Sequence, residues 1–320
     1  MRVVFLGTPD FAVKCLDTLL ASKNEVLAVV TQPDKPSERG NKIVFSDVKK
    51  YALEKGLKLY QYPKISRDGI NDMKELNPDI MVTAAYGQIL SQEFLDIAKF
   101  GVINVHASLL PKYRGASPIQ TAIINGDAET GVTIMQTEIG LDTGDIIAKE
   151  KIKINEDETY GELSDRLAEV GSNLLLKVLE SFEDNTVTFT KQEHIHASLT
   201  TKINKDDCII NWEKSSREIK SLIHGANPNP IARTLLGDEI VRIYKARSLD
   251  FEFNEEFRKL SPGTILPISS GKKGVFVRTG SSAIEILEMQ LAGGKVLPAK
   301  VLMNGRKINP YDCFKTTIKI

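Results

Sequence analysis

Short apolar runs alternate with amphipathic stretches at the start of the chain. Residues 3–6 form a run rich in β-branched side chains that ends at Gly7, and residues 26–30 form a second apolar run. Between them lies an amphipathic stretch to Leu20, in which Asp10 is placed to cap the first helical turn. A strand, a helix and a strand in this order predict a right-handed parallel unit of an α/β fold.

The same alternation continues as far as residue 182. Residues 79–85 are an almost continuous apolar run, as expected for a strand of a parallel sheet that is buried on both faces. Leu163, Leu167, Val170, Leu174 and Val178 recur at helical spacing and mark the buried face of one long helix. The pattern predicts helices at 49–55, 70–76, 118–125 and 159–182, and further strands at 57–60, 132–139 and 146–154. We therefore expect an α/β domain with a mostly parallel, Rossmann-like sheet.

The pattern changes in the last third of the chain. A polar, irregular stretch at 187–205 precedes a predicted helix at 215–225. Short alternating runs separated by glycine and proline follow it, at 239–246, 263–266, 274–278, 283–289 and 300–302. Several short strands with regular turns predict a small β-barrel. A chain of 320 residues fits one large domain or two, and we expect two.

Charge is balanced overall but unevenly distributed. The chain holds 42 basic and 42 acidic residues. From Lys205 to the end there are 19 Lys and Arg against 13 Asp and Glu, whereas residues 1–204 hold 23 against 29. A basic C-terminal third fits a part that binds a polyanion, although such an excess is also ordinary for a soluble domain.

Cysteine and histidine positions argue against a metal or a disulfide framework. Cys15, Cys208 and Cys313 are far apart and show no metal-ligand or redox spacing, which fits a reduced cytoplasmic protein. His194 and His196 alternate, but no further ligand lies at a usual spacing, so we expect no metal.

The first residues resemble a buried strand rather than a signal peptide, and no uncharged apolar run approaches roughly 18 residues. We expect a cytoplasmic protein.

The stretch 103–115, Ile-Asn-Val-His-Ala-Ser-Leu-Leu-Pro-Lys-Tyr-Arg-Gly, carries the candidate chemistry. Asn104 and His106 are two residues apart on a short strand, so their side chains point to the same face. Asp142 follows in a glycine-flanked loop at 140–145. An amide donor, an imidazole and a carboxylate suit acyl transfer through an oxyanion. Taken alone, however, a histidine near a strand end is more often structural, and the loop could be mere connection.

These motifs resemble the signature of the folate-dependent formyltransferases. The resemblance rests on residues 104–115 and 140–145 and on Gly-Thr-Pro-Asp-Phe at 7–11. It implies that Asn104, His106 and Asp142 are the catalytic set. In that set, Asn104 and protonated His106 donate to the oxyanion while Asp142 keeps the imidazole charged. It also implies a folate-binding segment made of Ser108, Leu109, Leu110 and Pro111.

Residues 131–145 resemble in particular the branch that acts on methionyl-tRNA. The resemblance implies transfer of the formyl group of 10-formyltetrahydrofolate to the α-amine of methionyl-initiator tRNA, giving N-formylmethionyl-tRNA for translation initiation. It further implies that a basic, proline-bounded insertion at 31–50 grips the acceptor arm of the tRNA through Arg39 and Lys42. From its residues alone, this insertion could equally be a solvated surface loop.

The resemblance also implies a domain organisation. We expect a catalytic domain at 1–189, a linker at 190–207 and an OB-like tRNA-binding domain at 208–320, in a protein that acts as a monomer. Two other functions remain open. A sugar-nucleotide N-formyltransferase shares the Asn, His and Asp but lacks the basic insertion, and an RNA-binding module could carry an inert version of the loop.

Overall fold

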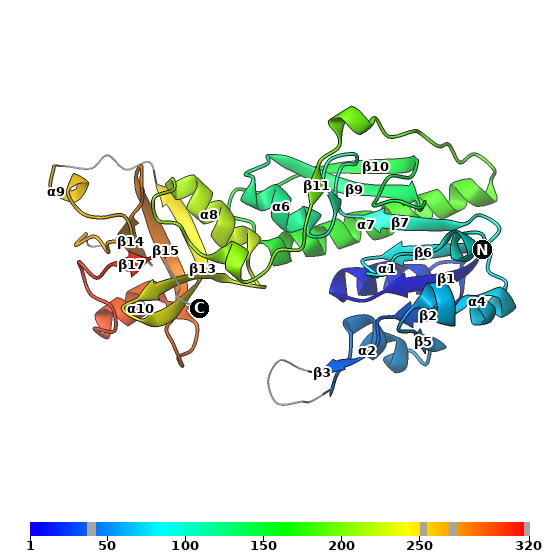
Figure 1. Ribbon diagram of the computed structural model, residues 1–320, viewed down its shortest axis with the longest axis horizontal. Helices are drawn as coiled ribbons and strands as arrows, with labels where there is room; N and C mark the ends of the chain where they lie inside the picture. The colour runs from blue at the N-terminus through cyan, green and yellow to red at the C-terminus, as the bar shows by residue number, and fades with distance from the viewer. Residues whose placement is uncertain (37–42, 250–254, 269–273, 317–320) are drawn as a thin grey trace. The chain divides into compact units, whose positions relative to one another are not determined.

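The computed structural model describes residues 1–36, 43–249, 255–268 and 274–316 (Figure 1). It divides into two compact units, which we describe separately. The first unit comprises Met1–Pro118, Thr130–Lys153 and Ser164–Thr200, and the second comprises Ile119–Glu129, Ile154–Leu163 and Thr201–Ile320.

A seven-stranded sheet forms the centre of the first unit, in the order β10-β9-β7-β6-β1-β2-β5. Strands β5, β2, β1, β6 and β7 pair in parallel, and β9 is antiparallel to β7. The expectation of a mostly parallel sheet is therefore confirmed. The strands are β1 (Arg2–Gly7), β2 (Glu25–Thr31), β5 (Leu59–Gln61), β6 (Ile80–Ala84), β7 (Val102–His106), β9 (Glu129–Gln136) and β10 (Ile146–Lys153).

Helices accompany the sheet. The apolar pattern predicted four of them, with small differences at their ends: α1 (Asp10–Leu20), α2 (Asp47–Glu54), α4 (Ile70–Leu76) and the long α7 (Tyr160–Glu183). The short helices α3 (Ile65–Asp68) and α5 (Gln92–Leu95) were not expected. The expectation that Asp10 caps α1 is wrong, because Pro9 is the N-cap and Asp10 is already helical. Four of the five apolar positions predicted to face inward from α7 are buried, while Val170 is half-buried.

Two short strand pairs matter for the site. Strands β3 (Lys35–Pro36) and β4 (Ile43–Val44) form an antiparallel hairpin at the base of the basic insertion. Strand β8 (Arg114–Gly115) pairs in parallel with β11 (Leu199–Thr200), which brings the segment before the second unit alongside the candidate catalytic loop. The 3-10 turn η1 (His194–His196) lies just ahead of β11.

The second unit is built on an antiparallel sheet in the order β14-β15-β13-β12-β17, with β16 on β15. The sheet curls into a half-barrel, which confirms the predicted barrel-like domain, and β13 carries an irregularity between Ile243 and Ala246 of the kind that bends a strand. Its strands are β12 (Ala232–Leu236), β13 (Glu239–Leu249), β14 (Val275–Arg278), β15 (Ala283–Gln290), β16 (Leu297–Pro298) and β17 (Phe314–Lys315). Its helices are α6 (Pro118–Ile124), α8 (Ser216–Gly225), α9 (Glu255–Arg258) and α10 (Ala299–Asn304), and the 3-10 turn η2 (Asp206–Cys208) precedes α8.

Several details of this unit differ from the expectation. Residues 300–302 belong to helix α10 and not to a strand, because so short an apolar run fits either period. Residues 263–266 form isolated bridges, with Val277 and Cys313, and not a regular strand. Strands β12, β16 and β17 and helix α9 were not expected, and β12 pairs with both β13 and β17.

An aromatic pair anchors the core of the second unit. The ring of Trp212 stacks on that of Phe314 with centroids 5.4 Å apart, and both side chains are buried. The Trp212 indole Nε1 donates to the hydroxyl of Thr234 at 2.9 Å. Ser215 and Glu218 complete a reciprocal capping box at the start of α8, which sits against β13.

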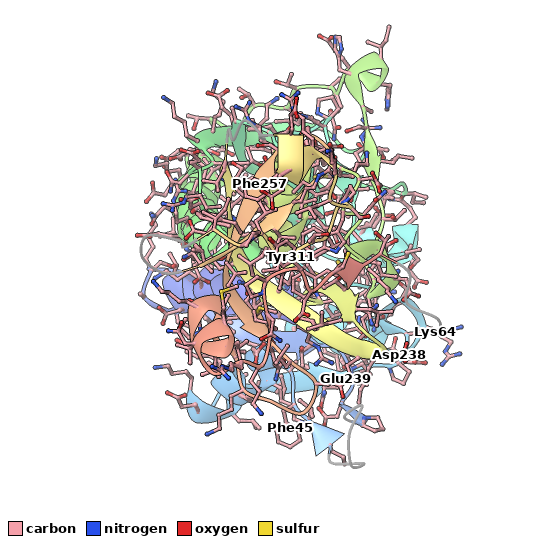
Figure 2. The ribbon with its side chains drawn as sticks, turned by 90° about the vertical axis from the view of Figure 1, so that its left-hand side faces the viewer. Phe45, Lys64, Asp238, Glu239, Phe257 and Tyr311 are labelled. Atoms are coloured by element: carbon pink, nitrogen blue, oxygen red, sulfur yellow. The ribbon has the colours of Figure 1, made fainter. Side chains whose placement is uncertain are left out.

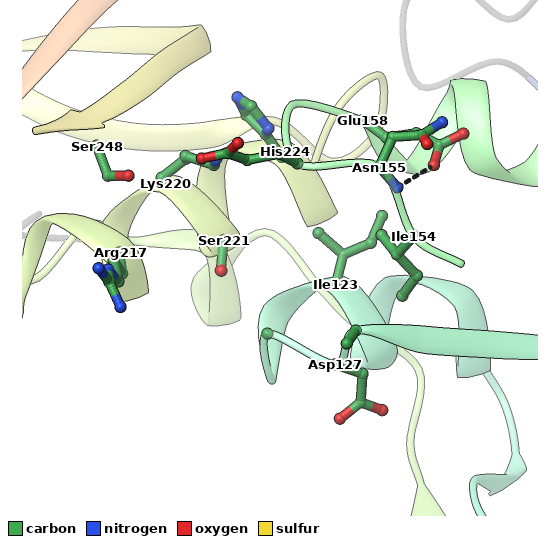
Figure 3. A pocket seen from close by; sticks show the side chains of 13 residues that line it. Ile123, Asp127, Ile154, Asn155, Glu158, Arg217, Lys220, Ser221, His224 and Ser248 are labelled. Atoms are coloured by element: carbon green, nitrogen blue, oxygen red, sulfur yellow. Dashed lines mark hydrogen bonds and ion pairs between the residues drawn. The ribbon is translucent and has the colours of Figure 1, made fainter.

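A polar pocket of about 430 Å³ lies within the second unit (Figure 3). Helix α8 contributes Lys220, whose ammonium pairs with the carboxylate of Asp157 at 3.0 Å. His224 also comes from α8 and is 1% exposed, with its Nε2 2.9 Å from the carbonyl oxygen of Ala246. Burial, reinforced by the positive charge of Lys220, lowers the pKa of His224 to about 4. This histidine therefore stays neutral in the folded protein at neutral pH.

The neutral state of His224 predicts a pH-dependent stability. In the unfolded chain the pKa of His224 returns to about 6.5, so the unfolded state binds more protons between pH 6.5 and pH 4. Stability should therefore fall as pH falls through that window, by about 2 kcal/mol between pH 7 and pH 5. Urea unfolding of the wild type and of His224→Gln at both pH values measures this term. An equal loss of stability in both proteins would contradict the prediction.

Candidate active site

Asn104 and His106 meet Asp142 at the end of β7. The Asn104 Nδ2 lies 3.5 Å from Asp142 Oδ1, and the His106 Nδ1 lies 3.6 Å from Asp142 Oδ2. His106 is 6% exposed, whereas Asn104 is half-buried. The structure thus brings the three predicted catalytic residues together, and the two-residue spacing does place Asn104 and His106 on one face.

A threonine on the neighbouring strand sets the orientation of Asn104. Thr83 on β6 is the register partner of Asn104, and its hydroxyl lies 3.0 Å from Asn104 Oδ1 and 3.2 Å from the carbonyl oxygen of Ile103. Because the hydroxyl donates to Oδ1, the amide nitrogen of Asn104 is the atom that faces Asp142. Sequence reasoning missed Thr83. The available signal was a lone hydroxyl in the apolar run 79–85.

Both ring nitrogens of His106 face oxygen acceptors. Its Nε2 is 3.0 Å from the carbonyl oxygen of Tyr113, which can only accept, so this nitrogen carries a proton. Its Nδ1 faces the carboxylate of Asp142. The imidazole ring is thus held between a carbonyl and a carboxylate.

Asp142 sits in a tightly folded loop. Its backbone has φ 51°, in the left-handed region, and its Oδ2 accepts a hydrogen bond from the backbone N–H of Gly115 at 2.7 Å. Two residues later, a Cβ at Gly144 would lie 1.9 Å from the carbonyl oxygen of Gln136, so only glycine fits there. The loop is therefore shaped by close backbone contacts that fix where the carboxylate lies.

A buried glutamine connects this loop to β8. The Gln192 Nε2 donates to the carbonyl oxygens of Asp142 at 2.9 Å and of Gly144 at 2.7 Å. The Gln192 Oε1 accepts from Nε and Nη2 of Arg114 at 3.1 and 2.8 Å, and Arg114 Nη1 lies 3.2 Å from His194 Nδ1. Sequence reasoning missed Gln192, because a single polar residue in an irregular stretch carries no periodic signal.

The predicted folate segment is a turn whose backbone groups are held by side-chain hydroxyls. Ser108 and Leu110 are buried, while Leu109 and Pro111 are half-buried. The Thr133 hydroxyl donates to the Ser108 carbonyl at 2.7 Å and lies 3.1 Å from the backbone N–H of Leu110. The hydroxyl of Ser108 is itself used within the turn, where it donates to the Lys112 carbonyl at 2.6 Å. Any ligand here would meet the exposed edge of the turn.

Arg39 and Lys42, the predicted tRNA contacts, lie outside the described residues. The base of their insertion is well braced, because Lys49 Nζ reaches Asp34 at 2.5 Å and Gln61 at 2.9 Å. Phe45, 40% exposed and labelled in Figure 2, follows β4 at this base, and the ammonium of Lys49 lies 4.0 Å from its ring centre.

Neither a metal-binding cluster nor a membrane-spanning helix is found among the described residues. They contain no group of three His, Cys, Asp or Glu side chains arranged to hold a metal ion. No helix among them is long and apolar enough to cross a membrane.

Both halves of the chain match models of known families. Residues 1–179 match the model described as "Formyl transferase", and residues 202–307 match "Formyl transferase, C-terminal domain". With the fold and the Asn–His–Asp site, these matches define a transferase of one-carbon groups. The chain belongs to the formyl transferase family.

Individual relatives are similar over almost the whole chain. Methionyl-tRNA formyltransferase of Acetivibrio thermocellus is 42% identical over 309 residues, which are 96% of this chain and 97% of the relative. The Legionella pneumophila protein of the same name is 42% identical over 308 residues, 96% of each chain. A solved N-formyltransferase from Helicobacter canadensis, in complex with folinic acid and dTDP-3-aminofucose, is 23% identical. It covers 89% of this chain and 98% of its own with a TM-score of 0.66, a likeness of fold alone.

The contact between Thr83 and Asn104 predicts a measurable effect on formyl transfer. Thr83→Val keeps the shape but leaves Asn104 Oδ1 without its donor, so the amide can rotate away from Asp142. We expect kcat to fall about tenfold, which corresponds to roughly one lost neutral hydrogen bond. Thr83→Ser keeps the hydroxyl and should retain near-normal kcat. Equal rates for the valine and serine variants would show that the hydroxyl does not orient Asn104.

Proposed function

We propose that this protein transfers the formyl group of 10-formyltetrahydrofolate to the α-amine of methionyl-initiator tRNA, giving N-formylmethionyl-tRNA for translation initiation. The observation that carries the proposal is the 42% identity to methionyl-tRNA formyltransferases along 96% of the chain. The aligned region spans both units, whereas two solved sugar formyltransferases share 21% and 23%. This difference favours methionyl-tRNA over an amino sugar as the acceptor.

In the proposed mechanism, the methionyl amine attacks the formyl carbon and an oxyanion forms on the formyl oxygen. Asn104 Nδ2 and His106 Nδ1 are the donors assigned to that oxygen. Their contacts with Asp142, at 3.5 and 3.6 Å, are longer than good hydrogen bonds, so both N–H groups can turn to a stronger acceptor. In this proposal Asp142 orients both donors. When the intermediate collapses, the bond to the folate nitrogen breaks and that nitrogen gains the proton lost by the amine.

The folate is assigned to the edge of the turn 108–111, next to His106. The turn is pinned by the Thr133 hydroxyl and by Lys149, whose ammonium donates to the Leu110 carbonyl at 3.0 Å. A rigid turn that directly follows the strand carrying His106 holds a bound cofactor at a fixed distance from the donors.

The tRNA is assigned to the insertion after β2 and to the C-terminal part of the chain. In this proposal Arg39 and Lys42 contact the acceptor arm. Residues 1–189 carry the chemistry, 190–207 form the linker, and 208–320 bind tRNA. The enzyme acts as a monomer in the cytoplasm, and three free cysteines fit a reducing compartment.

A product assay tests the proposed function. The protein is incubated with 10-formyltetrahydrofolate labelled in the formyl group, and with either methionyl-initiator tRNA or a dTDP-amino sugar. Label in the tRNA fraction, released as N-formylmethionine on deacylation, supports the proposal. Label in the sugar alone would replace it with the rival function, and label in neither would leave a binding module.

The catalytic set predicts large rate effects without loss of the fold. Asn104→Ala, His106→Ala and Asp142→Asn should each lower kcat by about 10²-fold or more, since each weakens oxyanion stabilisation. The KM for 10-formyltetrahydrofolate should change little. His196→Ala, at an exposed histidine in the same unit, is the control and should behave as the wild type. Near-normal turnover in any of the three variants would remove that residue from the set.

The basic insertion predicts a salt-dependent effect confined to one substrate. Arg39→Ala with Lys42→Ala should raise KM for methionyl-tRNA and make its salt dependence shallower, by a slope of roughly 1 per lost phosphate contact. The KM for 10-formyltetrahydrofolate should hold. Lys64→Ala with Lys99→Ala removes two exposed cations elsewhere and serves as the control. An unchanged KM and salt slope for tRNA would mean that the insertion is only surface.

A further inference from the structure

The loop that carries Asp142 is held by a group far away in sequence. Gln192 lies 50 residues beyond Asp142 and is 6% exposed. Its single amide nitrogen donates to two carbonyls of the loop, those of Asp142 and Gly144. These two carbonyls flank Thr143, so Gln192 fixes the backbone on the C-terminal side of the carboxylate.

The orientation of Gln192 is in turn set by Arg114. Two N–H groups of the guanidinium donate to Gln192 Oε1, which leaves only the amide nitrogen to face the loop. Arg114 is 5% exposed, and among the residues that the structure describes no carboxylate pairs with it. The third nitrogen of the guanidinium, Nη1, lies 3.2 Å from His194 Nδ1. The side chains of Arg114 and Gln192 therefore orient each other.

The contacts close into a ring around the candidate catalytic carboxylate. Gly115, the residue after Arg114, donates its backbone N–H to Asp142 Oδ2 at 2.7 Å. The ring runs from Gly115 to the Asp142 side chain, through the Asp142 backbone to Gln192, and back through Arg114. Strand β8 and the Asp142 loop are thereby fixed to each other by a side chain from the segment before the second unit.

We propose that Gln192, oriented by Arg114, is a positioning residue that holds Asp142 where it can act on His106 and Asn104. The proposal deepens the proposed function and rests on its assignment of Asp142 to the catalytic set. Gln192 touches neither substrate in this role. Because small displacements of a catalytic group can cost about 10²-fold in rate, the effect of losing Gln192 should appear in kcat.

Two substitutions test the contact between Gln192 and the Asp142 loop. Gln192→Met keeps the volume and loses both the donor and the acceptor. Gln192→Glu keeps an acceptor for Arg114 but places oxygen against the carbonyls of Asp142 and Gly144. We expect kcat to fall about 10- to 100-fold in both, with each KM within twofold of the wild type. In combination with Asp142→Asn, either change should add less than a further twofold loss.

A matched control is available in the second unit. Gln120 is also a buried glutamine, 7% exposed, whose amide nitrogen donates to two carbonyls, those of Gly225 and Asn229. Gln120→Met loses the same kind of contact away from Asp142. It should lower the melting temperature to a similar extent and leave kcat unchanged.

Hydrogen exchange provides a readout that does not need activity. In Gln192→Met the amide of Gly115, which donates to Asp142 Oδ2, should exchange at least about tenfold faster, because the ring that holds its acceptor is open. Gln120→Met should leave it unchanged. If the wild type fails to formylate methionyl-tRNA, the proposed function fails, while the exchange result still decides whether Gln192 holds the loop. Unchanged exchange, unchanged kcat, or a loss that adds fully to that of Asp142→Asn would each overturn the inference.

Discussion

The carboxylate of Asp142 is the acceptor on which the candidate site depends. Three donors converge on it: the amide of Asn104, the imidazole of His106 and the backbone N–H of Gly115. Only the last contact, at 2.7 Å, is a short hydrogen bond. The carboxylate is thus firmly anchored to the backbone at one oxygen and only loosely engaged by the two side chains. This is a suitable resting state for donors that must transfer their hydrogen bonds to an oxyanion.

The two sides of the site are held in different ways. Asn104 and His106 stand on a central strand, and the register of β7 against β6 also places the Thr83 hydroxyl beside Asn104. Asp142 stands on a loop, where no strand ladder fixes the backbone. A loop can hold a functional side chain in place as closely as a strand does only if other contacts replace the hydrogen bonds between strands. In this molecule the ring through Gln192 and Arg114 does so.

Sequence reasoning could predict the parts of the structure that follow from periodicity. The apolar run 79–85 and the two-residue spacing of Asn104 and His106 correctly gave a buried strand and a shared face. Sequence reasoning failed where two local structures are about equally favourable. Residues 300–302 form a helix, and at the start of α1 Pro9 occupies the N-cap position while Asp10 is already helical. The same reasoning could not find Gln192, because that residue acts through a contact between segments 50 residues apart, for which a single sequence carries no pattern.

The geometry of the candidate site cannot by itself select the acceptor substrate. In the proposed mechanism Asn104, His106 and Asp142 act on the formyl oxygen, which develops the same charge whatever amine attacks the formyl carbon. Such a set can in principle be kept while the acceptor changes, because function depends on the residues of a site and not on the fold alone. Selection of a tRNA must come from groups that touch the rest of the acceptor, and phosphate contacts supply affinity for any polyanion of that shape. Under this proposal a change of substrate should be sought in the basic insertion after β2, and not in the set of Asn104, His106 and Asp142.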